Sequence, residues 1–101
     1  MTHIYSKDGT KKVDIDKATL LGDVARDLEI YQQGENSQLW KSAKGSYFTG
    51  CCLDHWQGTG KTPSYTRIVP ISNERAKTWV IDYYGPDKLG TFGFKDIAEE
   101  L

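Results

Sequence analysis

The stretch Ser37-Gln-Leu-Trp-Lys-Ser-Ala-Lys-Gly-Ser-Tyr-Phe-Thr-Gly50 decides the fold that the sequence predicts. Side chains suited to strands alternate on both sides of Ala43-Lys44-Gly45, and the β-forming residues Tyr, Phe and Thr follow closely after the glycine. Gly45 can adopt the positive φ that a tight hairpin needs. We therefore predict two strands folded back on each other about residues 43–45, with one face covered and the other available to carry exposed rings.

The chain before this hairpin is predicted to add a second, shorter one. A strand over residues 2–5, a turn at Asp8-Gly9 and a returning strand over residues 11–15 have the alternation and turn residues of a β-hairpin. Asp16 is predicted to cap a single helical turn over residues 17–19. The N-terminal part of the chain is therefore expected to pair with itself.

Two further segments are expected to complete the sheet. Residues 20–27 fit a short helical stripe or a strand, and because Gly22 weakens a helix we favour a strand that ends near Asp27. Residues 66–70 read as another strand. Pro70 cannot donate to a strand ladder, so it should end the pairing or mark an edge of the sheet.

The C-terminal part of the chain carries the clearest helical pattern. Ser72 is a typical N-cap, and Gly85-Pro86 supplies a left-handed cap followed by a residue that cannot continue a helix. Between them, apolar residues recur at helical spacing at Ala76, Trp79, Val80 and Tyr83. A short terminal helix is predicted over residues 94–101. The fold class is therefore α+β: a small antiparallel sheet built on a central hairpin, packed by one main helix and a short terminal helix.

Composition sets the class of protein. The 101 residues are enough for a single domain spanning 1–101, and 38% hydrophobic residues with 12% aromatics exclude a disordered chain. The net charge of −1 shows no basic nucleic-acid footprint, so direct nucleic-acid binding is not expected. The chain has no apolar run long enough to span a membrane, and its two adjacent cysteines favour reduced thiols in a cytoplasm.

A phosphate-binding loop is suggested by Gly58-Thr-Gly-Lys-Thr62 but does not fit. The position five residues before Gly60 holds His55 where the pattern needs glycine. Pro63 also pushes Thr62 out of the helical geometry that the motif needs at that point. We interpret this segment as a glycine-rich loop.

Cys51, Cys52 and His55 resemble part of a metal or nucleophile site. Structural zinc needs four ligands, and the only other histidine is His3. Neighbouring residues on a strand point to opposite faces, so two adjacent cysteines make a poor chelating pair and a bridge between them would be strained. We therefore expect no metal, no cofactor and no enzymatic activity, with a Cys–His enzyme kept as the third alternative.

Aromatic and basic residues are the remaining candidates for binding. Rings and cations of the long loop and the hairpin could anchor a protein partner or stack on a base. The alternative is that these rings only attach the loop to the domain. The candidate binding residues, for a protein or a ligand, are Trp40, Tyr47, His55, Trp56, Lys61, Tyr65 and Arg67.

Three motifs resemble a family of small proteins from phages, plasmids and other mobile elements. They are Leu39-Trp-Lys-Ser42 with Lys44-Gly-Ser-Tyr-Phe48, then Arg67-Ile-Val-Pro-Ile-Ser72, then the Ala76-to-Trp79 helix. The resemblance covers about residues 10–85 and departs at Trp40 and Lys41, where the family has Tyr and Arg. It implies a small non-enzymatic protein and transfers no active-site residues.

The expected function is that of a phage or mobile-element accessory protein. By analogy with anti-CRISPR and anti-restriction proteins, it would bind and inhibit a bacterial defence component through protein–protein contact. The alternative is a small-ligand binder, such as a sponge for a nucleotide signal, in which Lys61 and Arg67 hold phosphate while Trp56 or Tyr65 stacks the base.

Overall fold

The computed structural model describes residues 3–31, 34–55 and 66–95. Six strands and two α-helices form its regular structure, joined by short 3₁₀ helices. They are β1 (His3–Tyr5), β2 (Lys12–Asp14), η1 (Ile15–Lys17), β3 (Thr19–Asp23), α1 (Val24–Asp27), β4 (Gln38–Lys41), β5 (Tyr47–Gly50), η2 (Leu53–His55), β6 (Val69–Ile71), α2 (Asn73–Tyr84), η3 (Pro86–Lys88) and η4 (Gly90–Phe92).

The predicted central hairpin is the middle of a four-stranded antiparallel sheet with the order β3-β4-β5-β6. Trp40 of β4 lies opposite Phe48 of β5 in the register. The turn between them is closed by Ser42 N–H donating to the Ser46 carbonyl at 2.7 Å, and Gly45 has a φ of 88°. The prediction of an α+β fold built on this hairpin is therefore confirmed.

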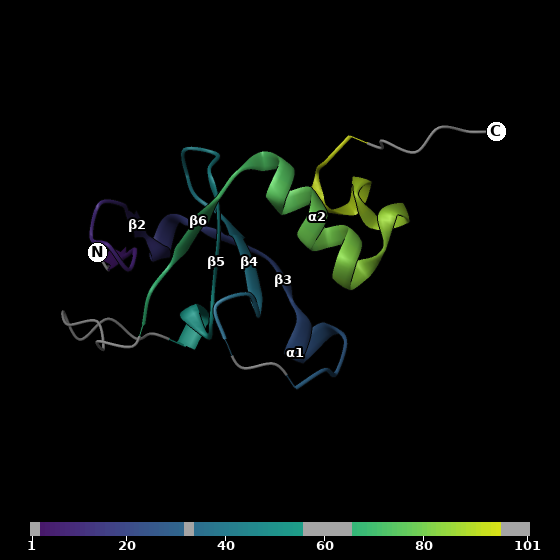
Figure 1. Ribbon diagram of the computed structural model, residues 1–101, viewed down its shortest axis with the longest axis horizontal. Coiled ribbons are helices and arrows are strands. Elements are labelled where there is room, and N and C mark those ends of the chain that lie inside the picture. The colour runs from purple at the N-terminus through teal and green to yellow at the C-terminus, as the bar shows by residue number, and fades with distance from the viewer. Residues whose placement is uncertain (1–2, 32–33, 56–65, 96–101) are drawn as a thin grey trace.

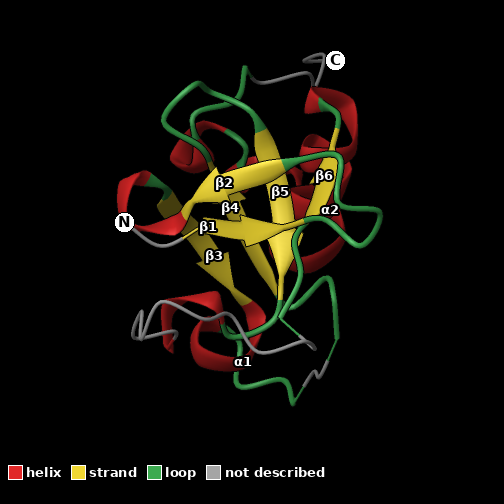
Figure 2. Ribbon diagram, turned by 90° about the vertical axis from the view of Figure 1, so that its left-hand side faces the viewer, coloured by secondary structure: helices red, strands yellow, loops and turns green. Residues whose placement is uncertain are grey.

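The sheet is covered on both faces, which corrects the prediction that one face of the hairpin is open. Figures 1 and 2 show the β1–β2 ribbon across one face and α2 against the other. Leu39 and Trp40 are neighbours on β4, point to opposite faces and are both buried. Strands buried on both faces carry apolar residues at consecutive positions, as β4 does at Leu39 and Trp40. The sequence prediction treated these two positions as one covered and one exposed.

Two hydrophobic cores result, one on each face. The ribbon-side core consists of Ile4, Val13, Ile15, Trp40, Phe48, Leu53 and Ile68. The helix-side core consists of Val24, Leu39, Ala76, Trp79, Val80, Leu89 and Phe94. The β4–β5 hairpin supplies side chains to both cores and so joins the three layers.

Helix α2 forms as its sequence predicts. The Ser72 hydroxyl accepts a hydrogen bond from Arg75 N–H at 3.1 Å, and Gly85 ends the helix with a φ of 98°. Trp79 is buried against the sheet. After the helix, two 3₁₀ turns bring Leu89 and Phe94 back into the helix-side core.

The N-terminal hairpin is also as predicted, and Asp8 holds its turn. One carboxylate oxygen of Asp8 accepts hydrogen bonds from the Ser6 hydroxyl, the Thr10 N–H and the Thr10 hydroxyl. These bonds, led by that of the Thr10 N–H, lower the pKa of Asp8 to about 2. The turn therefore keeps its charged carboxylate at all physiological pH values.

Three local predictions differ from the structure. Residues 19–23 form β3, but the chain then turns into α1 because the Asp23 side chain caps Ala25 and Arg26 N–H. The early helical turn is η1, capped by Asp14 instead of Asp16. The predicted terminal helix lies mostly outside the described residues, and Phe94 and Lys95, which are described, are not helical.

The strand predicted over residues 66–70 lies later in the chain, because β6 covers Val69–Ile71. Pro70 lies on this edge strand, as its missing N–H predicts, but the pairing continues to Ile71 instead of ending at the proline. No helix in the described part of the chain is long and apolar enough to cross a membrane.

Candidate functional site

An open groove of about 670 Å³ lies between the β1–β2 ribbon, the 42–46 turn and β6. Four lysines line it, from segments far apart in the sequence: Lys11, Lys12, Lys17 and Lys44. All four side chains are exposed. We call this feature the lysine groove.

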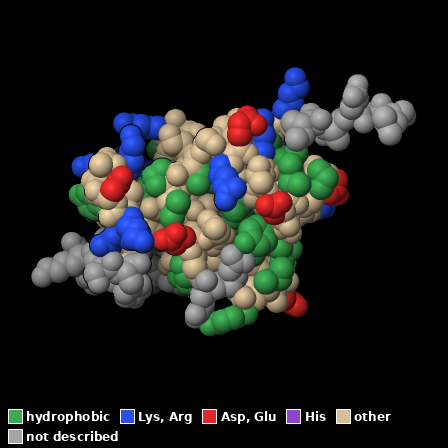
Figure 3. Space-filling view, viewed as in Figure 1, with side chains coloured by type: hydrophobic (Ala, Val, Ile, Leu, Met, Phe, Trp, Pro, Cys, Tyr) green, Lys and Arg blue, Asp and Glu red, His purple; other side chains and the backbone are tan. Residues whose placement is uncertain are grey.

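The four lysines make the groove locally positive, although the whole chain has a net charge of −1. Among the described residues that line it, Asp14 is the one carboxylate. Within residues 3–31, 34–55 and 66–95, none of the four lysines forms an ion pair with a carboxylate. Figure 3 shows basic side chains gathered at the left-hand end of the molecule, over the β1–β2 ribbon. An anionic group approaching this end would therefore meet unneutralised cations.

The walls and floor of the lysine groove are largely apolar. Val13, Phe48 and Ile68 are buried members of the ribbon-side core, and Pro70 and Ile71 of β6 extend the apolar lining. The tight packing beneath fixes the shape of the floor. The groove therefore pairs cations at its rim with an apolar surface, a combination that suits an acidic ligand that also carries apolar groups.

Three of the residues predicted from the sequence as a binding site are described, and they lie in different surroundings. Trp40 is buried and stacks on Phe48, so it belongs to the core. Tyr47 lines the lysine groove, and its ring contacts Lys41 and Phe94. Arg67 is half-buried, and its Nη1 donates to the Thr66 carbonyl at 2.8 Å.

The other four predicted residues lie partly or wholly outside the described part of the chain. The His55 backbone lies in η2. Its side chain, together with Trp56, Lys61 and Tyr65, lies outside the described residues.

Sequence reasoning missed the four lysines of the groove because nothing in the sequence joins them. Lys11, Lys12 and Lys17 belong to the N-terminal ribbon and the turn after it, while Lys44 lies at the tip of the central hairpin. Only the crossing of the ribbon over the sheet brings the two hairpins together. The Lys11-Lys12 pair was the one local signal.

A buried polar network lies at the opposite end of β4. The Gln38 amide nitrogen donates to Asp23 at 3.0 Å and to Asp54 at 2.8 Å. Its carbonyl oxygen accepts from Trp40 Nε1 and from Leu53 N–H. The amide lies between the two carboxylates and ties η2 to the sheet.

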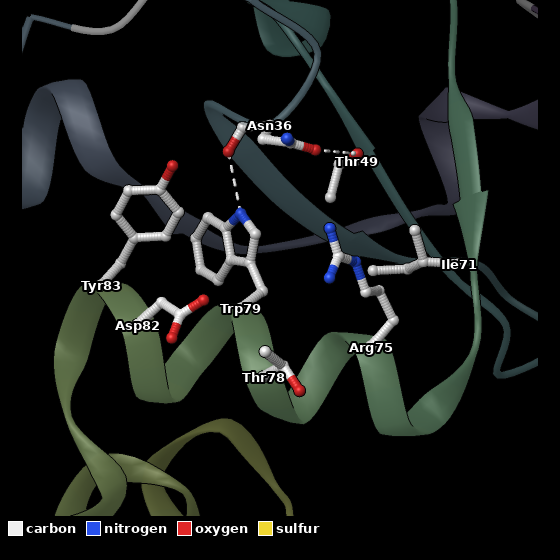
Figure 4. Close-up of a pocket in the computed structure, with 8 residues that line it drawn as sticks. All are labelled: Asn36, Thr49, Ile71, Arg75, Thr78, Trp79, Asp82 and Tyr83. Carbon is white, nitrogen blue, oxygen red and sulfur yellow. Dashed lines mark hydrogen bonds between the residues drawn. The ribbon is translucent and has the colours of Figure 1, made fainter.

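A smaller cleft of about 90 Å³ lies between α2 and the chain at Asn36 (Figure 4). Trp79 Nε1 donates to the Asn36 carbonyl at 2.8 Å, and the Thr49 hydroxyl donates to the Asn36 side chain at 3.3 Å. Arg75 extends from α2 beside Trp79 (Figure 4). Ligand pockets usually enclose roughly 300–1,000 Å³, so this cleft is too small for most ligands.

No group of three or more His, Cys, Asp or Glu side chains among the described residues could hold a metal ion. Comparisons of the chain with protein-family models, with curated proteins and with solved structures gave no match. The resemblance of residues 10–85 to mobile-element proteins therefore stays a prediction.

Proposed function

We propose that this protein acts by protein–protein contact, and that the lysine groove receives an acidic segment of its partner. One observation carries the proposal: two hairpins far apart in the sequence bring four exposed lysines around an apolar floor. Pro70 interrupts the donors of the neighbouring edge strand. Recognition would therefore use side chains in the groove rather than addition of a strand.

The two parts of the groove would contribute differently. Exposed lysines attract an acidic partner over about 8–10 Å at moderate salt, which raises the association rate more than the affinity. Burial of the apolar surface that Pro70 and Ile71 still expose in the groove would add affinity, at about 25 cal/mol per Å² of apolar surface. A partner segment that alternates acidic and apolar residues would match both parts.

The partner we propose is a bacterial defence component, which the protein would inhibit by occupying one of its surfaces. The resemblance to phage and mobile-element proteins supports this role by analogy. A folded protein with a shaped, charged groove is suited to inhibition by contact.

A small anionic ligand such as a nucleotide signal is the second candidate. The volume of the lysine groove, about 670 Å³, lies within the usual range of small-ligand sites. Against this candidate, the Tyr47 ring already contacts Phe94 and Lys41. The groove therefore offers charge to a phosphate more readily than a ring face to a base.

Charge reversal in the groove tests the proposal. A labelled peptide of alternating Glu and Leu would be titrated with the wild type, with a Lys12→Glu, Lys44→Glu double variant and with Lys88→Glu, an exposed lysine of η3 outside the groove. We expect the double variant to raise Kd about tenfold or more and to weaken its salt dependence. Lys88→Glu should bind like the wild type.

The same three proteins would then be compared for inhibition of restriction and CRISPR interference in bacteria challenged with phage. Loss of inhibition in the double variant alone supports the proposal. Equal peptide binding by all three proteins would overturn it. Tight binding and a thermal shift with a nucleotide, lost in the double variant and without peptide binding, would establish the second candidate instead.

A further inference from the structure

The two cysteines meet, contrary to their expected placement on opposite faces of a strand. Strand β5 ends at Gly50, so Cys51 and Cys52 lie beyond it in a bend. Their Sγ atoms are 3.3 Å apart, with Cys51 half-buried and Cys52 exposed. The expectation failed because the alternation of side chains holds only within a strand.

The bend is held at both ends by packing. A Cβ added at Gly50 would lie 2.5 Å from Leu53 Cδ1, so only glycine allows the buried Leu53 to pack so closely. Leu53 N–H is also fixed by Gln38. Between these anchors Cys52 has a φ of 55°, a left-handed conformation that is strained for a non-glycine residue. Such strain occurs often at functional sites.

Hydrogen bonds distinguish the two thiols. Burial opposes ionisation of Cys51, but the nearby Gly34 N–H, the Cys52 thiol and the Ser37 side chain together lower the pKa of Cys51 below its usual value. The hydrogen bond to Cys51, with burial and the charge of Asp54 adding to it, raises the pKa of Cys52 to about 11. Cys51 therefore ionises first, and Cys52 keeps its proton.

We propose that Cys51 and Cys52 form a thiol pair that reacts with hydroperoxides. Cys51 is the attacking thiolate and Cys52 is the thiol that resolves the product. A cysteine whose sulfur lies 3.3 Å from a second, exposed thiol has its resolving partner already in place, an arrangement found in cysteines that peroxide oxidises reversibly. This inference does not depend on the lysine groove.

The reaction has two steps. The Cys51 thiolate attacks a peroxide oxygen, the O–O bond breaks, the leaving alkoxide or hydroxide takes up a proton, and Cys51 becomes a sulfenic acid. The Cys52 sulfur then attacks the Cys51 sulfur, the S–O bond breaks, and the hydroxyl leaves with the Cys52 proton as water. The hydroperoxide gains two electrons, and the two thiols lose them to form one disulfide.

The product would be easily reversed. Adjacent Cα atoms lie about 3.8 Å apart, less than the roughly 4.4 Å that disulfides usually span, so the bond is strained. Strained, exposed disulfides have more oxidising potentials and are reduced readily by other thiols. The pair would therefore report an oxidant transiently.

Intact-mass measurement after treatment with hydrogen peroxide tests the proposal. We expect each wild-type chain to lose two hydrogen atoms without forming dimers, and a dithiol reductant to restore them. In Cys52→Ser, Cys51 should stop at the sulfenic acid and be captured by dimedone. In Cys51→Ser, Cys52 loses its hydrogen bond with Cys51 but keeps the burial and the nearby Asp54 charge that also raise its pKa, so it should still react more slowly than Cys51 does in the other variant. Circular dichroism would verify that both variants fold.

The order of the two rates separates the proposal from simple accessibility. Cys52 is the more exposed residue, so residue exposure alone predicts that Cys51→Ser reacts faster than Cys52→Ser. A faster reaction of Cys51→Ser than of Cys52→Ser would overturn the proposal. Oxidation of the wild type only to dimers or to sulfinic acid, without an intrachain disulfide, would overturn it as well.

Discussion

At the scale of single residues, Gln38 organises one end of the sheet. Its side chain is 2% exposed, and the two amide atoms make four hydrogen bonds, to Asp23, Asp54, Trp40 and Leu53. A buried amide is tolerated when its donors and acceptor are satisfied, as they are here. Gln38 thereby connects β3, β4 and η2.

Replacement of Gln38 by leucine should destabilise the protein by about 3 kcal/mol. The buried Trp40 Nε1–H and the Leu53 N–H would lose their acceptor, and unsatisfied buried donors cost about 1–3 kcal/mol each. Urea denaturation measures the free energy of unfolding. Thr49→Val is the matched control, since Thr49 is equally buried but donates one hydrogen bond of 3.3 Å, so we expect a loss of about 1 kcal/mol. Equal losses in the two variants would contradict the role of Gln38.

At the scale of elements, the contact between β3 and α2 depends on the absence of a side chain at Gly22. A Cβ there would lie 3.0 Å from Phe92 Cε1 and 3.1 Å from Trp79 Cη2. Trp79 has little room to withdraw, because its indole N–H is bonded to the Asn36 carbonyl. The strand pairing also shifts register between Leu20 and Gly22, which bends β3 beneath the helix.

Gly22→Ala should therefore destabilise the protein by about 1–3 kcal/mol, the usual cost of forcing an extra methyl group into a packed core. Gly90→Ala is the control, because a Cβ at Gly90 would meet no atom within 4 Å. We expect its stability to be unchanged or slightly increased. Thermal unfolding followed by calorimetry gives both values, and a Gly22→Ala melting temperature equal to that of Gly90→Ala would refute this account of the contact.

At the scale of the whole molecule, two cores share one hairpin. The ribbon-side core contains Trp40 and the helix-side core contains Trp79, on opposite faces of the same sheet. The ribbon buries Ile4 and Val13 towards the sheet, and α2 buries Trp79 and Val80 in the core on the other face. The two cores should therefore form and melt together.

We predict that unfolding is a single transition in which both cores report the same midpoint. In a Trp56→Phe background, Trp40→Phe leaves the Trp79 emission as a probe of the helix side, and Trp79→Phe leaves Trp40 as a probe of the ribbon side. After correction for the stability of each variant by circular dichroism, emission and circular dichroism should give coincident urea curves in both proteins. A ribbon-side signal that melts at lower urea than the circular dichroism would show that the ribbon detaches first.

The sequence by itself determined the local elements. The 37–50 hairpin follows from Gly45 and its flanking β-formers, and α2 follows from the Ser72 cap, the apolar spacing through Trp79 and the stop at Gly85. These features depend on backbone conformation and on residues a few positions apart, so short-range patterns predict them.

The tertiary structure alone decided what these elements do together. Crossing the β1–β2 ribbon over the sheet buried Trp40, which the sequence had offered as a binding ring, and brought Lys12 beside the tip that carries Lys44. The bend after β5 likewise placed the Cys51 and Cys52 thiols in contact instead of on opposite faces. The burial of Trp40 and the clustering of the lysines depend on residues that are far apart in the sequence, and the contact of the thiols depends on an irregular bend. No local period in the sequence encodes a long-range contact or an irregular bend.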